Sequence, residues 1–150
     1  FLYSLYNLYR FSHYYEEAYG KYIWLKSGAS LVIEHTEAMT VIDVNTGSVL
    51  KKKKQEDTLF YQINREAAKE IARQLRLRNI SGIIMIDFIN MKDTAQKEKL
   101  LSLLDSECKK DRVHCNVIDM TALNLVEMTR SKVRKPLHEQ IRSCMKNNRS

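Results

Sequence analysis

Apolar residues along the chain alternate between short continuous runs and one long stretch with helical spacing. Residues 31–33 and 39–44 are apolar runs on either side of a polar turn at 35–37, which predicts a hairpin of two strands. From Thr58 the apolar residues recur at four-residue steps, as they do on one face of a long helix. They are Leu59, Ile63, Ala67, Ile71 and Leu75.

The second half of the chain alternates between predicted strands and helices. Residues 82–88 predict a strand, a helical pattern with Leu100, Leu103 and Leu104 follows, and residues 115–120 predict a further strand. Residues 123–130 predict a short amphipathic helix. This order favours an α/β fold in which a mixed β-sheet is flanked by helices. The 150 residues allow one domain with a modest core.

The two ends of the chain differ from the middle in composition. Seven tyrosines fall within residues 1–22, and we predict that they pack in a core or an interface, where aromatic residues are enriched. Stacking on nucleic-acid bases is the alternative. Residues 137–150 belong to a basic tail that we predict to be unstructured without a partner. The basic residues of this end are Lys132, Arg134, Lys135, Arg142, Lys146 and Arg149.

The charge of the chain narrows the choice of partner. The formal net charge is +7 and the isoelectric point is about 9.3, which favours a polyanion such as nucleic acid. An acidic protein or a membrane surface also fits basic charge alone. The chain has no apolar run long enough to span a membrane and no signal-peptide pattern, so we expect a soluble, cytoplasmic protein. Its three cysteines, Cys108, Cys115 and Cys144, predict reduced thiols.

Two aspartates occupy the ends of apolar strands, where a carboxylate can face a cleft. Asp43 ends one apolar run and Asp87 ends another, while Asn45 points to the same face as Asp43 because it lies two residues further along an extended chain. Three oxygen donors of this kind suit Mg²⁺, or alternatively Mn²⁺. Helix capping and turn formation are the competing interpretation. Asp119 ends the third strand and is a weaker metal candidate.

Four strings of residues resemble the ribonuclease E/G family, and especially its ribonuclease G branch. They are TEAMTVIDVNTG at 36–47, NREAAKEIARQLRLRN at 64–79, IDFINM at 86–91 and LVEMTR at 125–130. The resemblance runs from about Trp24 to Pro136 in the family's order. It implies that residues 27–136 form a catalytic deoxyribonuclease-I-like subdomain. Residues 1–26 would then be the tail of a preceding ribonuclease-H-like subdomain.

The resemblance also implies an activity and a site. It implies a Mg²⁺-dependent endoribonuclease that hydrolyses single-stranded RNA, often at chains with a 5′-monophosphate, in mRNA decay and in rRNA and tRNA processing. Asp43 and Asp87 would bind the metal, and Asn45 would complete the catalytic group. Basic residues would neutralise the RNA backbone, although each arginine alone fits a structural role on a helix surface equally well. These residues are Arg73, Arg76, Arg78, Lys51, Lys52, Lys53 and Lys54.

Three departures from the family pattern bear on function. Arg112 and His114 also belong to the predicted RNA-binding residues. Two places after Arg112, however, the family usually has a basic residue that contributes to 5′-phosphate sensing, and here His114 would bind RNA only weakly and in a pH-dependent way. The family's Cys-Pro-x-Cys zinc link is represented only by Cys144, so we predict no zinc. The family's S1-type RNA-binding domain and most of its 5′-end sensor would precede Phe1.

These departures leave two alternatives to an active nuclease. The chain could be an RNA-binding module that cleaves weakly or not at all without the missing domains. It could also be a structural piece that docks through its tyrosine-rich N-terminus. Its partner would be the rest of a longer ribonuclease chain or a second copy of itself.

Overall fold

The computed structural model describes residues 18–47 and 56–147, and these residues form one mixed β-sheet with helices packed on it. The strand order is β1-β2-β3-β4-β6-β5, and every neighbouring pair is antiparallel except β3 and β4, which are parallel. The sequence prediction of an α/β fold with a mixed sheet is confirmed. The strands are β1 (Tyr22–Trp24), β2 (Ser30–His35), β3 (Met39–Asn45), β4 (Gly82–Asp87), β5 (Cys115–Met120) and β6 (Leu125–Arg130).

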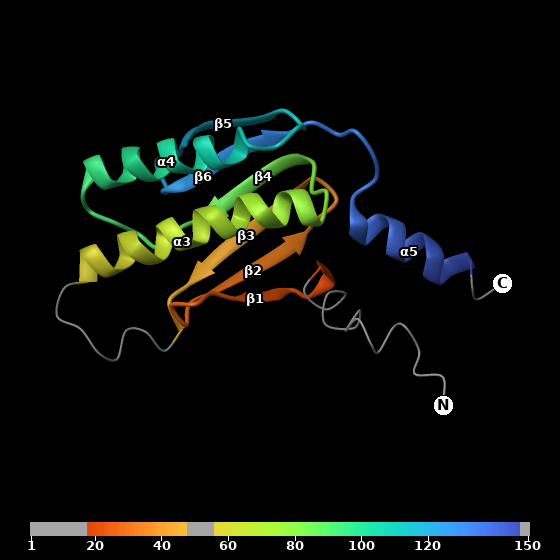
Figure 1. The fold of residues 1–150 in the computed structure, drawn as a ribbon, viewed down its shortest axis with the longest axis horizontal. Helices are drawn as coiled ribbons and strands as arrows, with labels where there is room; N and C mark the ends of the chain where they lie inside the picture. Colours follow the sequence, from red (N-terminus) through yellow and green to blue (C-terminus); the bar gives the residue numbers. More distant parts are fainter. Residues whose placement is uncertain (1–17, 48–55, 148–150) are drawn as a thin grey trace.

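Helices α3 (Glu56–Leu77) and α4 (Thr94–Cys108) cover one face of the sheet, and α5 (Leu137–Asn147) lies beside one end of it (Figure 1). The apolar face of α3 is buried as its spacing predicts, with Ile63, Ala67 and Ile71 each at most 1% exposed. Alternate strand residues such as Ile42 and Ile86 complete this core. In the described part of the chain, no helix has the length and apolar character needed to cross a membrane.

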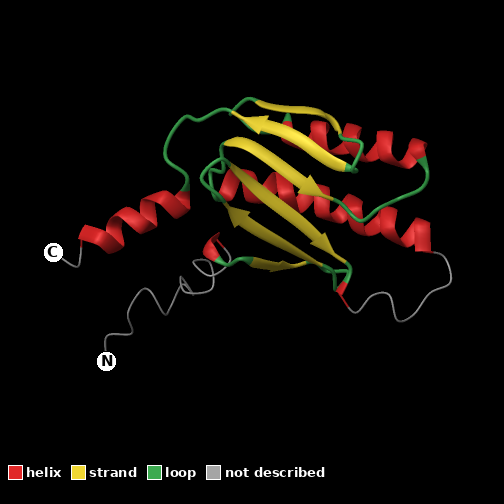
Figure 2. Cartoon of the chain, turned by 180° about the vertical axis from the view of Figure 1, so that it is seen from behind, coloured by secondary structure: helices red, strands yellow, loops and turns green. Residues whose placement is uncertain are grey.

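The other face of the sheet is uncovered by helices (Figure 2). Because side chains alternate along a strand, the residues between the buried ones point to this open face. Ile83 on β4 and Ile118 on β5 are about half exposed there, at 49% and 55%. The open face is where the candidate site lies.

The parallel pair β3 and β4 is joined by α3, which must run back across the sheet to make the connection. Both strands therefore end at the edge where α3 begins, as their arrowheads show in Figure 1. Helix α4 starts with Asp93 as its N-cap, whose Oδ1 accepts a hydrogen bond from the backbone N–H of Ala95 at 2.9 Å.

Two predictions for the remaining segments are wrong. Residues 125–130 form strand β6 and not a helix, because Val126, Met128 and Arg130 are buried in alternation between β4 and β5. Residues 137–147, predicted to be unstructured, form α5, whose first backbone N–H, that of Leu137, donates to the carbonyl of Arg78 at 2.9 Å.

The prediction that the N-terminal tyrosines pack in a core or an interface is tested for two of them only, and the interface stays a prediction. Tyr19 and Tyr22 are 47% and 60% exposed and lie outside the core. The tyrosines before residue 18 lie outside the described residues.

Candidate functional site

The carboxylates of Asp43 and Asp87 come from neighbouring positions at the ends of β3 and β4. The two residues are register partners in the parallel pair, so both side chains leave the sheet on its open face. Adjacent strands are about 4.8 Å apart, which puts the two carboxylates within reach of one cation. Asn45 donates through Nδ2 to Oδ2 of Asp43 at 2.8 Å and holds that carboxylate in place. The structure thus brings together the three residues that the sequence singled out.

A glycine after this strand shapes the exit of the chain from the site. Gly47 has φ of +57°, a left-handed conformation that a side chain strains. A Cβ at this position would also lie 2.6 Å from the carbonyl oxygen of Gly28, in the turn between β1 and β2. Glycine at position 47 therefore lets the end of β3 pack tightly against that turn.

The electrostatics of the aspartate pair favour a cation. Partial burial, and then the negative charge of Asp43, raise the pKa of Asp87 above its usual range. Two carboxylates this close repel one another until a positive charge or a proton is shared between them. The described residues contain no cluster of three or more His, Cys, Asp or Glu side chains that could hold a metal. A site with two carboxylates and an amide fits Mg²⁺, which keeps several waters and needs only one or two carboxylates.

The predicted arginines lie at the opposite end of the sheet from this pair. Because α3 runs back from the ends of the strands, its last turns reach the edge where β4 begins. That edge is about 17 Å from Asp87 along β4, at about 3.3 Å for each residue. Arg73 donates through Nε to Glu70 at 3.1 Å, and Arg76 donates to the carbonyl of Glu107 at 3.4 Å.

Two other parts of the predicted RNA-binding set have different outcomes. Arg78 is only 4% exposed and its Nε donates to Oε1 of Gln74 at 2.7 Å, so its surroundings do not fit the predicted contact with RNA at the surface. Residues 51–54, the four lysines, lie outside the described residues.

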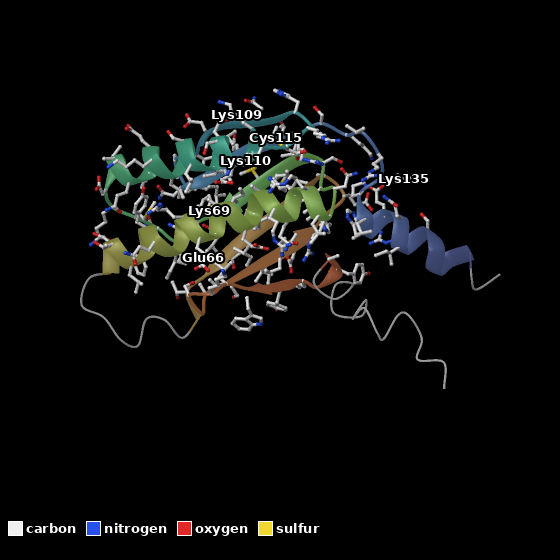
Figure 3. The ribbon with its side chains drawn as sticks, in the orientation of Figure 1. Glu66, Lys69, Lys109, Lys110, Cys115 and Lys135 are labelled. Atoms are coloured by element: carbon white, nitrogen blue, oxygen red, sulfur yellow. The ribbon has the colours of Figure 1, made fainter. Side chains whose placement is uncertain are left out.

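A basic cavity of about 480 Å³ lies near the start of β4, at the same end as the arginines. Arg76 and the predicted Arg112 both line it, together with Arg130. His114 is exposed just before β5. Lys109 and Lys110, at the end of α4, and Lys135, before α5, lie around this part of the molecule (Figure 3). Sequence reasoning missed Lys110, Arg130 and Arg134 as cavity residues, although Arg130 closes one of the strings that carry the family resemblance.

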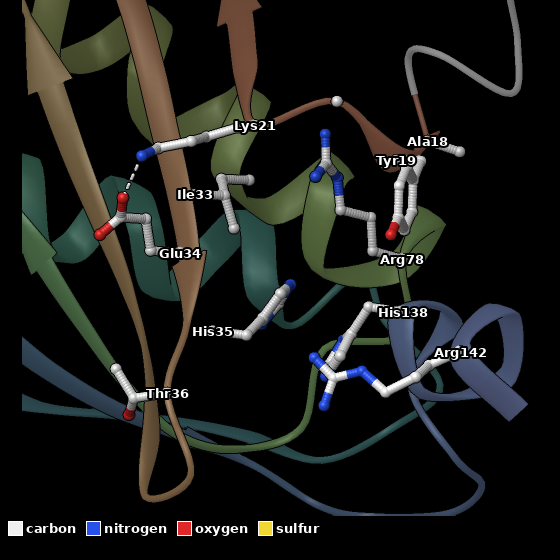
Figure 4. A pocket seen from close by; sticks show the side chains of 11 residues that line it. Ala18, Tyr19, Lys21, Ile33, Glu34, His35, Thr36, Arg78, His138 and Arg142 are labelled. Carbon is white, nitrogen blue, oxygen red and sulfur yellow. Dashed lines mark ion pairs between the residues drawn. The ribbon is translucent and has the colours of Figure 1, made fainter. Parts of the chain in front are cut away.

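A second cavity, of about 640 Å³, is lined by residues of β2 and by the first turns of α5 (Figure 4). His35 and His138 stack there with their ring centroids 3.8 Å apart. Burial, the neighbouring His138 and then Arg78 lower the pKa of His35 to about 4, and Glu139 opposes this only in part. His35 is therefore neutral in the folded protein near neutral pH.

This histidine pair makes the stability of the protein depend on pH. Below a pH of about 6.5 the unfolded chain binds a proton at His35 and the folded chain does not, so stability should fall between about pH 6.5 and about pH 4. Unfolding curves of the protein and of His35→Phe at a series of pH values test this. The variant keeps an aromatic ring in the stack and should lose part of the pH dependence. Identical pH dependence in the two proteins would contradict the expectation.

Comparison with known proteins decides the family. The model of the Ribonuclease E/G family matches residues 2–133, which is most of the chain. The chain belongs to the ribonuclease E/G family. The resemblance seen in the four sequence strings is thereby confirmed.

The similar members of the ribonuclease E/G family include both of its named branches. The chain is 45% identical to Ribonuclease G of Escherichia coli K12 over 122 residues, which are 81% of this chain and 25% of that protein. It is 44% identical to Ribonuclease G of Haemophilus influenzae over 133 residues, 89% of this chain and 27% of the relative. It is 42% identical to Ribonuclease E of Nostoc over 115 residues, which are 77% of this chain and 17% of the relative. The chain thus spans about a quarter of the length of its ribonuclease G relatives.

Proposed function

We propose that this chain carries the metal-binding site of an endoribonuclease that hydrolyses single-stranded RNA with Mg²⁺. The observation that supports this most directly is the register pairing of Asp43 with Asp87, with Asn45 bonded to the first. Membership of the ribonuclease E/G family supports it independently. Mn²⁺ has the same ligand preferences and would substitute.

Each of the three residues has a distinct part in this proposal. Asp43 and Asp87 hold the cation between them, and their mutual repulsion favours its binding. Asn45 fixes the orientation of the Asp43 carboxylate through its 2.8 Å hydrogen bond. When bound, the metal supplies a water of lowered pKa and compensates the charge that develops on the scissile phosphate.

The basic cavity at the other end of the sheet supports an RNA substrate with a charged 5′ end. Arg76, Arg112 and the exposed Arg134 line it, about 17 Å from Asp87 along the strand direction. A few nucleotides of a single strand span that distance. The proposal therefore includes recognition of a 5′-monophosphate at this cavity.

The proposal extends to the setting in which the chain works. The proposal includes a part in mRNA decay and in rRNA and tRNA processing, in the cytoplasm; the ribonuclease names of the relatives and the basic charge support the RNA substrate on which it depends. The partner would be the rest of a longer ribonuclease chain or a second copy of this one.

A second candidate function is RNA binding without efficient cleavage. The separation between the basic cavity and the aspartate pair favours it, because RNA can bind at the first without reaching the second. Such binding would weaken steeply with salt, as expected when several phosphates are neutralised.

One experiment separates the two candidates. The chain is incubated with a 5′-monophosphorylated, AU-rich single-stranded RNA in Mg²⁺ or in EDTA, beside the same RNA with a 5′-hydroxyl. Internal cleavage that requires Mg²⁺ and is faster on the phosphorylated RNA supports the nuclease. RNA that is bound but intact at every Mg²⁺ concentration would overturn the nuclease proposal for this chain and favour the binding module.

A further inference from the structure

The open face of the sheet carries an exposed tryptophan in the same row as Asn45, one of the three candidate site residues. Trp24 pairs with Ser30, and Ser30 pairs with Asn45, so the three residues follow one another across β1, β2 and β3. Ile23 beside it is buried on the helical face, so Trp24 points to the open face, as Asn45 does. Two strand spacings separate them, or about 10 Å.

Trp24 is unusually accessible for a side chain of its size. It is 73% exposed, and it is the single tryptophan of the chain. In the next row Tyr22 is 60% exposed. It pairs with Val32 on β2, which pairs with Asp43 on β3. Tyr22 and Trp24 lie on the same face of β1 and so form one exposed apolar patch, and such patches are typical of interaction sites. Because Tyr22 and Asp43 are both paired with Val32, this surface lies two strand spacings, or about 10 Å, from the aspartate pair.

The neighbourhood of Trp24 is basic. A cavity of about 790 Å³ runs between β1 and α3 and is lined by Trp24, Lys26, Lys69 and Arg73. Lys26 and Lys69 are exposed, and Figure 3 shows Lys69 on α3 close to Glu66. Arg76 lines this cavity as well as the basic cavity near the start of β4, so the two cavities are neighbours.

The acidic side chains of this cavity are engaged within the protein. Glu66 accepts hydrogen bonds from the backbone N–H groups of Lys26 at 2.7 Å and Ser27 at 3.3 Å, which fixes the chain after β1. Glu70 accepts from Arg73 and from Gln74. The lining has four basic side chains, Lys26, Lys69, Arg73 and Arg76, against these two carboxylates, so the surface keeps a net positive charge. An aromatic platform flanked by cations is the combination that binds single-stranded nucleic acid without regard to sequence.

We propose that Trp24 stacks on a base of single-stranded RNA one or two nucleotides from the scissile phosphate, and that Lys26 and Lys69 contact the neighbouring phosphates. The position relative to the scissile phosphate rests on the nuclease function proposed above. The stacking itself rests only on the exposure and surroundings of Trp24. Tyr22 gives a second, weaker surface, because the ammonium group of Lys21 lies over its ring at 5.7 Å.

Trp24 is its own probe, so binding can be followed without a label or cleavage. The protein is titrated in EDTA with a short single-stranded 2′-O-methyl RNA that nucleases do not cut, and the tryptophan fluorescence is recorded. Stacking should quench the emission with saturation. Fluorescence anisotropy with a labelled copy of the same oligonucleotide should show about a tenfold or greater loss of affinity in Trp24→Ala. Trp24→Phe keeps an aromatic face and should lose less.

A matched control uses another exposed apolar side chain of the same sheet face. Ile83 is 49% exposed on β4, four residues before Asp87, and Ile83→Ala should bind the oligonucleotide as the unchanged protein does. Circular dichroism of each variant checks that it is folded. If Trp24→Ala does not fold, the quenching of the unchanged protein and the affinity of Trp24→Phe still decide the question.

The outcomes separate this inference from the nuclease proposal. Saturable quenching without any Mg²⁺-dependent cleavage of ordinary RNA would support the stacking platform and count against the nuclease. Cleavage with no quenching, and with unchanged affinity in Trp24→Ala, would overturn the platform alone. A blue-shifted emission that acrylamide does not quench, in a protein that is dimeric by light scattering, would also overturn it, because a second copy would then cover Trp24.

Discussion

Replacing Asp43 by asparagine is expected to lower Mg²⁺-dependent RNA cleavage by at least about 100-fold, because charge stabilisation by a catalytic metal is worth several kcal/mol. The substitution removes one of the two carboxylates of the pair and keeps the size of the side chain. Asp87→Asn should have the same effect, since the two residues are register partners on adjacent strands. Cleavage rates of a 5′-monophosphorylated RNA at saturating Mg²⁺ measure the loss.

The same variants should remain folded and should still bind RNA. Loss of the Asp43 charge removes a repulsion that raises the pKa of Asp87, so the melting temperature in EDTA should be unchanged or slightly higher. RNA affinity in EDTA should be equal or greater, because a negative charge has been removed from a surface that faces a polyanion. A loss of activity accompanied by unfolding would not support a metal-binding role.

Asp119→Asn is the matched control for these variants. Asp119 also lies on a strand of the sheet, but its Oδ1 accepts from the backbone N–H of Met120 at 2.7 Å, and β6 separates it from Asp87. Its cleavage rate should stay close to that of the unchanged protein. If Asp43→Asn cleaved RNA as fast as Asp119→Asn, the proposed metal site would be wrong.

Replacing Arg130 by methionine is expected to lower the free energy of unfolding by about 3–5 kcal/mol. Arg130 and Asp111 have side chains only 3% and 8% exposed, and Nε of the arginine lies 2.9 Å from Oδ2 of the aspartate. Arg130 also donates through Nη1 to Asn79 at 3.0 Å and to the carbonyl of Ile80 at 2.9 Å. Methionine fills much of the same volume, but it leaves the Asp111 carboxylate buried without its cation.

Urea unfolding of Arg130→Met, Asp111→Asn and the double variant measures this interaction. The double variant should be more stable than the sum of the two single losses predicts, because the second substitution removes the group that the first leaves unpaired. Arg112→Met is the control. Arg112 is exposed, so its substitution should change stability by no more than about 0.5 kcal/mol. If Arg130→Met lost no more stability than the Arg112→Met control, the expectation would be refuted.

The buried ion pair also makes the stability of the protein depend on pH in the acid range. Burial alone would raise the pKa of Asp111, but hydrogen bonds from Arg130 and from the backbone N–H of Val113 outweigh it, and the pKa is lowered overall. A lowered carboxyl pKa contributes stability that is present at neutral pH and is lost as the pH falls through that pKa. This contribution should be absent from the acid unfolding curve of Asp111→Asn.

Local patterns in the sequence predicted the elements whose burial is set by their own spacing. The four-residue steps of Ile63, Ala67 and Ile71 and the apolar runs before Asp43 and Asp87 were enough to place α3, β3 and β4. The two strand ends then implied that the aspartates meet. This worked because a parallel pair joined by one helix brings both strand ends to the same edge.

Other features depend on partners distant in the chain. Leu125, Val126 and Met128 fit a helix face as well as a strand, and pairing with β4 on one side and β5 on the other selects the strand. Arg78 lies on the predicted helix but is buried next to the start of α5, whose first N–H it accepts through its carbonyl. β1 has only three residues, too few to show an alternating pattern, so the row that joins Trp24 to Asn45 appears only in the folded sheet.

The crossover between β3 and β4 has a consequence for the time at which the aspartate pair forms. Asp43 and Asp87 become neighbours only when β4 has paired with β3 in parallel, and β4 is synthesised after the whole of α3. Pairings between distant parts of a chain form slowly compared with local helices and hairpins. A chain still on the ribosome before β4 emerges would therefore have its first carboxylate in place and no second one beside it. Such a growing chain, next to the message that encodes it, would have no aspartate pair with which to cut that RNA.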